Sequence, residues 1–554
     1  MSARPPTSPS LQRADWLLLA LASVLSSVWC VTAARQLGAT FDEPFYLQAG
    51  LDYWRTGNPT RLLAAGTMPL PSHLQTLPLY VLERVRGRPW TWPDELAAML
   101  PIARSMTLLF WWVLLIYVMR LGRALGGPWA GRLAVLLLAL EPSVLAHAAL
   151  ATTDLAAAAC LLMFTVHFRA GRPLGWFRRV GLPTLLFAMA LLAKASALTL
   201  GPLVMIGVEI ERWLRGAAIG SSRGPSTWRV GDLWRASRAL RRDGAVIVIF
   251  GVLLAVVYCG SGGGPSFQGT LSRMRPDALL RPVVAWVGQW PLMPNGFYAL
   301  WFQADHNRFG QGTYLIGYES ARWLWFYVPV LLTIKLSTVL LLLTGAALAA
   351  PGHRVALLVG LAATILLLCV QVRVQTGIRL LLPVLSFAVV GLAVRVAGLI
   401  ESLPSRSKRV GIGLMTAMLA WLLVVDLRLW PDALRYVNAI WGGTERGYLV
   451  VSDSNYDWGQ GLPDLARWRQ SHQVPLAVWY FGTDPRYPEL PRFDPDREAL
   501  DEAIRSGRYL AVGTSWLYGG YVKSGPGREV VLRLRQMHAV ARTPTFLIFG
   551  EAAP

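Results

Sequence analysis

Charged residues are scarce in this sequence. Asp, Glu, Lys and Arg together make up 15% of its 554 residues, whereas hydrophobic residues make up 54%. This composition and the repeated long apolar runs exclude a water-soluble chain of this length. We therefore expect a polytopic membrane protein, with membrane lipids as partners of much of its surface.

Cysteine is rare as well, and each cysteine lies alone in an apolar run. That spacing predicts neither a disulfide framework nor a cysteine metal cluster. The sequence also lacks long-period repeats and low-complexity tracts. The four cysteines are Cys30, Cys160, Cys259 and Cys369.

Acidic residues are outnumbered: there are 32 against 53 basic residues, which gives a formal net charge of +21. In a soluble chain this excess would suggest a nucleic-acid partner. Here the arginines cluster between hydrophobic runs, which is typical of positive-inside topology and of attraction to anionic lipid headgroups. We therefore expect no nucleic-acid partner.

The positive-inside rule predicts about eleven transmembrane helices, with the N-terminus in the cytoplasm. We expect the first run to be an uncleaved helix, because no clear cleavage site precedes the acidic loop that follows it. The basic connector after residue 210 is cytoplasmic only if 181–210 crosses twice, with a turn near Lys194. The expected crossings are 16–34, 102–119, 133–149, 155–168, 181–210 (two helices), 244–259, 323–346, 355–370, 378–397 and 410–427.

This topology divides the chain into a transmembrane domain, 1–427, and an extracytoplasmic tail, 428–554. It also gives the transmembrane domain two external loops, 35–101 and 260–322. Alternating short strands and helices predict a small α/β domain in the tail. The expected strands are 448–451, 476–480, 509–512 and 546–549, and the expected helices are 463–469 and 496–505.

Paired acids follow the first apolar run, at Asp42-Glu43, and another acid follows the third expected crossing, at Asp154. A carboxylate in a partly desolvated loop can act as a general base. The alternative for each is helix capping or interaction with a helix dipole. We interpret His147, between the two sites, as a hydrogen-bonded interface histidine.

Three basic residues lie at or near the expected outer surface: Lys194 inside an apolar stretch, and Arg373 and Arg379 around Gln375-Thr376-Gly377. A cation buried at a membrane boundary favours an anion, and a lipid phosphate is a natural one. Arginine is suited to bidentate phosphate contacts. The alternative is that these side chains extend towards the headgroups.

Polar loops supply the remaining candidates for substrate binding. Asp305 and His306 lie in the second external loop, and Asn455 and Asp457 follow an expected strand of the tail. A lone Asp-His pair is weak as a metal site, so we predict no dedicated metal ligands, although an acid-rich mouth could recruit a divalent cation. The tail residues fit either ligand binding or Asx-turn formation.

Four motifs together resemble family-39-type glycosyltransferases. They are Asp42-Glu43, the stretch from Pro142 to Thr153-Asp154, Lys194 in Leu-Ala-Lys, and Gly377-Ile378-Arg379-Leu380-Leu381-Leu382-Pro383. Relatives include protein O-mannosyltransferases and lipid A aminoarabinose transferases. The chain departs from the family pattern in the first loop, where Phe41 precedes the acids and Met68-Pro69-Leu70-Pro71, with His73 displaced, replaces a His-Pro-Pro-like element.

The resemblance implies a C-type fold in a bacterial inner membrane and inverting transfer of a sugar from a polyprenyl-phosphate carrier to an acceptor hydroxyl. It implies Asp42 as the base, Glu43 and Asp154 as positioning acids, and Lys194 and Arg379 as phosphate ligands. The resemblance does not decide whether the acceptor is a protein, a glycan or a lipid. There are two alternatives. One is a transporter or lipid-sugar flippase without transferase activity, and the other is an inactive scaffold for the tail.

Overall fold

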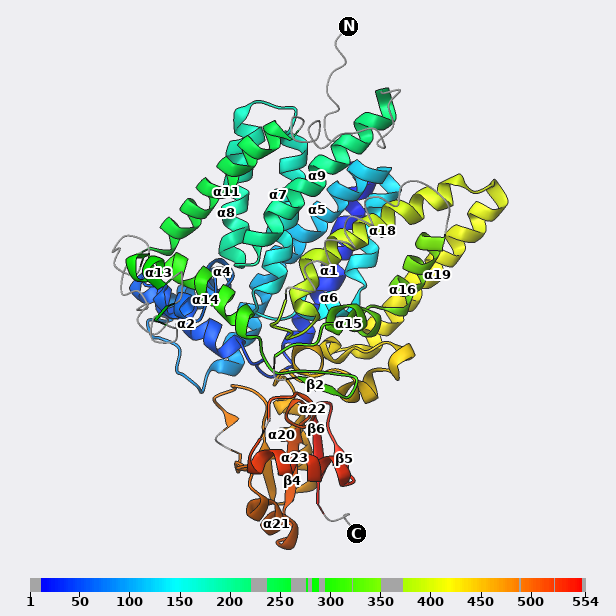
Figure 1. Ribbon diagram of the computed structural model, residues 1–554. Helices are drawn as coiled ribbons and strands as arrows, with labels where there is room; N and C mark the ends of the chain where they lie inside the picture. The colour runs from blue at the N-terminus through cyan, green and yellow to red at the C-terminus, as the bar shows by residue number, and fades with distance from the viewer. Residues whose placement is uncertain are drawn as a thin grey trace.

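The chain forms a helical bundle with a small α/β unit at one end (Figure 1). The structure is a computed structural model, and it describes residues 11–220, 237–260, 276–277, 281–287, 294–320, 322–349, 372–487, 490–522 and 524–550. The bundle helices are α1 (Arg13–Ala34), α5 (Leu96–Ala139), α6 (Pro142–Ala148), α7 (Asp154–Gly171), η1 (Phe177–Gly181), α8 (Leu182–Ala193), α9 (Ala197–Gly220), α11 (Arg238–Cys259), α15 (Tyr327–Lys335), α16 (Thr338–Ala349), η3 (Ile378–Leu381), α18 (Leu382–Ser402) and α19 (Ser405–Leu429).

Six helices among the described residues are long and apolar enough to cross a membrane, and a bent pair would make a seventh. They are α1, α5, α7, α11, α18 with its preceding turn η3, and α19. The predicted total of eleven crossings is therefore not confirmed. One expected crossing, 355–370, lies outside the described residues.

Helix α5 contains two antiparallel halves that join at Gly127. This residue has a φ of +86°, and its backbone is not helical. A Cβ built on Gly122 would lie 2.9 Å from the Cα of Gly131, although nine residues of straight helix would separate them by about 13 Å. The first half contains the expected run 102–119, whereas the expected run 133–149 begins in the second half and continues, after a turn at Leu140 and Glu141, into α6.

The break between α8 and α9 falls at Lys194, where the sequence predicted a turn. Helix α8 ends at Ala193, Lys194 has an extended backbone, and α9 begins at Ala197. By contrast, the expected crossing 323–346 is not one straight helix. It is split into α15 and α16, which are bent by 115° around Leu336 and Ser337.

Short elements fill the two predicted external loops. The first loop contains three helices, and the described residues of the second form two helices and an antiparallel hairpin. Figure 1 shows α2 and α14 beside the bundle, towards the end that carries the α/β unit. These elements are α2 (Glu43–Thr56), α3 (Thr60–Ala64), α4 (Leu70–Arg86), α13 (Arg281–Val287), α14 (Pro294–Phe309), β1 (Thr313–Leu315) and β2 (Tyr318–Ser320).

The C-terminal unit, residues 462–549, is a four-stranded sheet with helices on both faces. The strand order is β3-β4-β6-β5, with β3 parallel to β4 and the other pairs antiparallel. Alternate residues of each strand belong to two separate apolar clusters, because strand side chains alternate between faces. Its elements are α20 (Leu462–His472), β3 (Leu476–Trp479), α21 (Arg497–Arg505), β4 (Tyr509–Gly513), α22 (Thr514–Tyr518), α23 (Pro526–Gln536), β5 (Ala541–Arg542) and β6 (Phe546–Phe549).

One predicted strand of the tail, 448–451, is wrong. It begins inside the 3-10 helix η6 (Thr444–Leu449), and only Val451 forms an isolated bridge, to Leu315. The remaining short turns between the bundle and the C-terminal unit are η4 (Ala433–Arg435), η5 (Ala439–Trp441) and η7 (Asp453–Asn455). The domain boundary at residue 428 stays a prediction.

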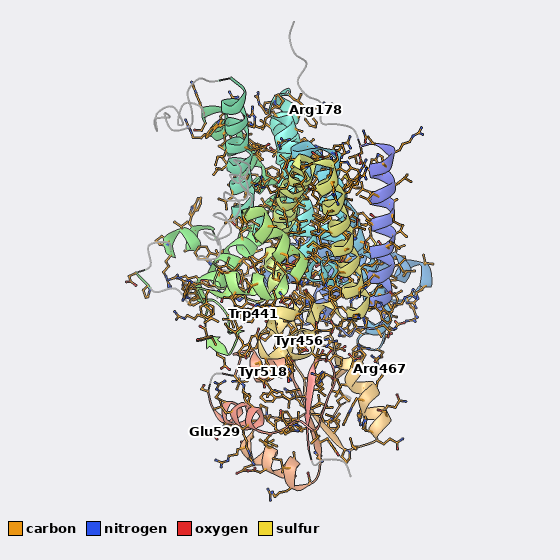
Figure 2. The ribbon with its side chains drawn as sticks, turned by 90° about the vertical axis from the view of Figure 1, so that its right-hand side faces the viewer. Arg178, Trp441, Tyr456, Arg467, Tyr518 and Glu529 are labelled. Atoms are coloured by element: carbon orange, nitrogen blue, oxygen red, sulfur yellow. The ribbon has the colours of Figure 1, made fainter. Side chains whose placement is uncertain are left out.

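Several basic residues lie at the end of the bundle far from the C-terminal unit. Figure 2 shows Arg178 at the end far from the C-terminal unit, whereas Tyr456 lies at the junction with that unit. Buried Asp15 of α1 pairs with Arg123 and Arg132, which flank the α5 turn. The cytoplasmic placement of this end stays a prediction of the positive-inside rule.

Candidate active site

Four of the ten predicted site residues form one chain of ion pairs. Arg379 Nη1 donates to Asp42 Oδ2 over 2.8 Å and lies 3.8 Å from Asp154 Oδ2. Lys194 Nζ donates to the other oxygen of Asp154. Along this chain of contacts the order is Asp42, Arg379, Asp154 and Lys194, so acids and cations alternate.

The four side chains differ in their access to solvent. Asp154 is fully buried, whereas the side chains of Asp42, Lys194 and Arg379 are 25%, 23% and 13% exposed. Asp42 Oδ2 also accepts a 3.4 Å hydrogen bond from the Tyr46 hydroxyl. No hydrogen bond from a described residue reaches Asp42 Oδ1, so that oxygen can accept a proton from an incoming group.

Three of these residues lie at the ends of helices, and Arg379 lies in a short 3-10 turn. Asp42 is the N-cap residue of α2, Asp154 begins α7, Lys194 lies at the α8–α9 break and Arg379 lies in η3. The Asp42 side chain makes no capping hydrogen bond to its own helix. The capping alternative therefore does not explain this carboxylate.

Glu43, the second acid of the pair, points into the protein. Its carboxylate receives a bidentate contact from Arg104, at 2.8 and 2.6 Å, and further hydrogen bonds from Thr40 and from Ala151 N. Burial raises the pKa of Glu43, but Arg104 and the other donors outweigh burial and hold it below its ordinary value. Glu43 thus anchors the acidic loop to the segment that precedes Asp154.

The loop of residues 452–460 (the 452–460 loop below) holds both partners of the Asp42–Arg379 pair. On the acid side, Trp458 O and Gln460 O accept hydrogen bonds of 2.8 Å from Phe41 N and Gly38 N. On the cation side, Asn455 Oδ1 accepts from Ile378 N at 2.9 Å. The loop is therefore a scaffold for the ion pairs.

Two predicted tail residues, Asn455 and Asp457, act within this scaffold and are buried. Asp457 accepts from Ser515 N at 3.1 Å and from the Thr514 hydroxyl at 3.3 Å, which joins the loop to the start of α22. Burial raises the pKa of Asp457 to about 7, although these groups and Gly459 N donate to it. Neither residue reaches the four-residue cluster directly.

The other three predicted residues make their contacts outside the four-residue cluster. Arg373 Nη1 donates to the carbonyl of Arg308 at 3.0 Å. Asp305 and His306 lie on α14, where the imidazole packs against Phe302. Among the described residues, no group of three His, Cys, Asp or Glu side chains could hold a metal ion.

Sequence reasoning missed three contributors. Arg104 is a lone arginine in an apolar run, so the reasoning applied to Lys194 could have found it. Trp458 carried no signal among 24 tryptophans. His147 was interpreted as hydrogen-bonded, yet both of its ring nitrogens are buried without a hydrogen-bond partner among the described residues.

Gly377, which precedes η3, offers a test of how closely the 452–460 loop packs against the segment that carries Arg379. Its φ is +129°, and a Cβ would overlap Ser454 Oγ and lie 3.2 Å from Asn455 Oδ1. We expect Gly377→Ala to displace Arg379 and lower activity at least about tenfold, because misplacement by about 1 Å can cost about 100-fold. Transfer assays of the purified variant check this, with Gly413→Ala as control, because a Cβ there meets nothing within 4 Å. Unchanged activity of Gly377→Ala would contradict the close fit.

Comparisons with known proteins give a structural likeness only. No protein-family model and no curated protein matches the chain. The chain is similar to ArnT from Cupriavidus metallidurans bound to undecaprenyl phosphate, with 14% identity and a TM-score of 0.44 over 97% of this chain and 98% of that chain. For the apo state of the same protein, the identity is 13% and the TM-score 0.41, over 97% of both chains. We therefore base the function on this chain's own residues.

Proposed function

We propose that this protein is an inverting glycosyltransferase that moves a sugar from a polyprenyl-phosphate carrier to an acceptor hydroxyl at the outer face of a bacterial inner membrane. The observation that carries the proposal is the chain of ion pairs from Asp42 to Lys194, at the end of the bundle that carries the C-terminal unit. The motif resemblance supports the same reaction. We assign this end to the outside and the N-terminus to the cytoplasm, as the positive-inside rule predicts.

In this reaction Asp42 acts as the general base. Its Oδ2 is held by Arg379 and Tyr46, which leaves Oδ1 to take the proton of the acceptor hydroxyl. The acceptor oxygen forms a bond to the anomeric carbon as the bond from that carbon to the phosphate oxygen breaks. The electron pair of the broken bond stays on the phosphate, which leaves attached to its lipid. A single displacement inverts the anomeric carbon.

Arg379 and Lys194 stabilise the negative charge that develops on the departing phosphate. Both are partly exposed, and the buried Asp154 between them keeps them in place. Arg379 Nε is buried without a hydrogen-bond partner among the described residues, so a phosphate contacts this side chain where it is exposed. The lipid chain stays in the membrane beside the bundle.

Comparing the three predicted cations tests this assignment. Loss of one donor to a developing negative charge costs about 10²- to 10³-fold in rate, so Arg379→Ala and Lys194→Ala should each lower transfer about 100-fold. Arg373→Ala should change it less than about threefold, because that side chain binds the Arg308 carbonyl. Steady-state transfer rates check this. An equal loss for all three variants would contradict a phosphate site centred on Arg379 and Lys194.

One experiment separates the proposed transferase from the alternative flippase. Purified protein is reconstituted into vesicles with a radiolabelled polyprenyl-phosphate sugar and an extract of bacterial envelope as the acceptor source. Label that moves from the lipid to a delipidated product supports the transferase. Label that crosses the bilayer while it stays on the lipid, with no product formed, would support the flippase and overturn our proposal.

A further inference from the structure

Trp458, in the 452–460 loop, lies directly against the guanidinium of Arg379. The Cζ of Arg379 lies 4.2 Å from the centroid of the indole ring, and Trp458 is 2% exposed. A cation held over an aromatic face in a buried site is attracted by the ring and restricted in its orientation. The stacking partner of the central cation is therefore supplied by a loop far away in the sequence.

The backbone of the same residue holds the acidic loop. Trp458 O accepts a 2.8 Å hydrogen bond from Phe41 N, one residue before Asp42. Trp458 N in turn donates to Gln460 Oε1 at 2.8 Å, and the Gln460 amide donates to Asp432. One residue thus contacts the cation through its ring and the chain next to the base through its carbonyl.

The C-terminal unit fixes the position of this loop. Asp457, the neighbour of Trp458, is bound by Thr514 and Ser515 at the start of α22, directly after β4. Phe481, which follows β3, packs its ring against Phe41 at 5.7 Å between centroids. The sheet of the C-terminal unit is thereby connected to both sides of the Asp42–Arg379 pair.

We infer that Trp458 is a positioning residue that orients the Arg379 guanidinium for phosphate binding, so that the C-terminal unit completes the active site. This inference rests on the proposed function. Arg379 has two acids within 4 Å and could turn to bind one of them through two nitrogens. The indole ring, 4.2 Å from the guanidinium carbon, opposes that rotation and so keeps the partly exposed Arg379 side chain in the orientation that a phosphate meets.

The test measures the binding of polyprenyl monophosphate, which depends on neither the sugar nor the acceptor. The concentration of this lipid that gives half-maximal thermal stabilisation of the purified full-length protein is measured for each variant. Trp458→Leu should raise it about tenfold, which lies within the range of cation–π interactions at desolvated sites. Trp458→Phe, which keeps an aromatic face, should raise it less than about threefold.

Trp468→Leu is the matched control, because Trp468 lies on α20 and stacks on His472, away from Arg379. A double-mutant cycle separates positioning from general destabilisation. If Trp458 acts through Arg379, Trp458→Leu should cause no further loss of binding in an Arg379→Ala background. An equal loss in both backgrounds, or unchanged binding by Trp458→Leu, would overturn the inference. Failure of the unmodified protein to bind the lipid would instead overturn the proposed function itself.

Discussion

Asp42→Asn is expected to abolish sugar transfer while the protein still inserts and folds. Asparagine has the shape of aspartate but cannot take a proton, so the acceptor hydroxyl would remain protonated as its oxygen attacks. General-base catalysis contributes about 10²- to 10⁴-fold, so transfer should fall at least about 100-fold. The loss should appear in turnover and leave binding of polyprenyl monophosphate within about threefold, which transfer and binding assays on the same preparation measure.

Asp52→Asn is the matched control for this prediction. Asp52 lies on the same helix, is more exposed than Asp42 and pairs with Arg61 rather than with any member of the cluster. We expect it to keep full activity. If Asp42→Asn retained transfer, Asp42 would not be the base, and its Oδ1 would have no role in catalysis.

Much of the site could be predicted because charge in a membrane protein is informative. The turn at Lys194 followed from one physical requirement, that the basic connector after residue 210 stay on the cytoplasmic side. Asp42 and Asp154 stood out because ionised groups at a membrane boundary need a partner or a function. The structure brings these residues together with Arg379, whereas their chemical roles stay predictions.

The orientation of side chains could not be predicted from the same pattern. Asp42 and Glu43 are adjacent, yet one is partly exposed and the other is buried on Arg104. Successive residues at a helix start point in different directions, and the direction of each depends on which partner folds against it. The position of Arg104, about sixty residues away, is decided by tertiary packing alone.

Irregular backbone was the other source of error. The bend between α15 and α16 is stabilised by Ser337 N, which donates to the buried Glu141, and by the Asn438 amide, which donates to two carbonyls there. These partners are distant in sequence, so the apolar run 323–346 gave no sign of a break. The stretch 448–451 has the composition of a strand, but its first two residues belong to a 3-10 helix and its pairing with β1 stops at a single bridge from Val451 to Leu315.

The buried pair of Glu43 and Arg104 should matter more for folding than for chemistry. Both side chains are fully buried, and Arg104 also donates to the carbonyls of Ala34, Leu37 and Gly38. Removing one partner of a buried ion pair leaves an uncompensated charge and costs about 3–5 kcal/mol. We therefore expect Glu43→Gln to lower the thermal unfolding temperature markedly, and Glu95→Gln, at a partly exposed pair of the same external loop, to change it little.

The pH dependence of stability tests the same pair. Because the pKa of Glu43 in the folded protein lies below its ordinary value of 4.5, the carboxylate stabilises the fold above pH 4.5, and this contribution is lost as pH falls further towards the folded pKa. The unmodified protein should therefore lose stability below pH 4.5 more steeply than Glu43→Gln, which has nothing to protonate there. Thermal unfolding between pH 3 and pH 7 measures the difference. If Glu43→Gln unfolded like the unmodified protein at every pH yet lost transfer, Glu43 would act in the chemistry and not as the anchor of the acidic loop.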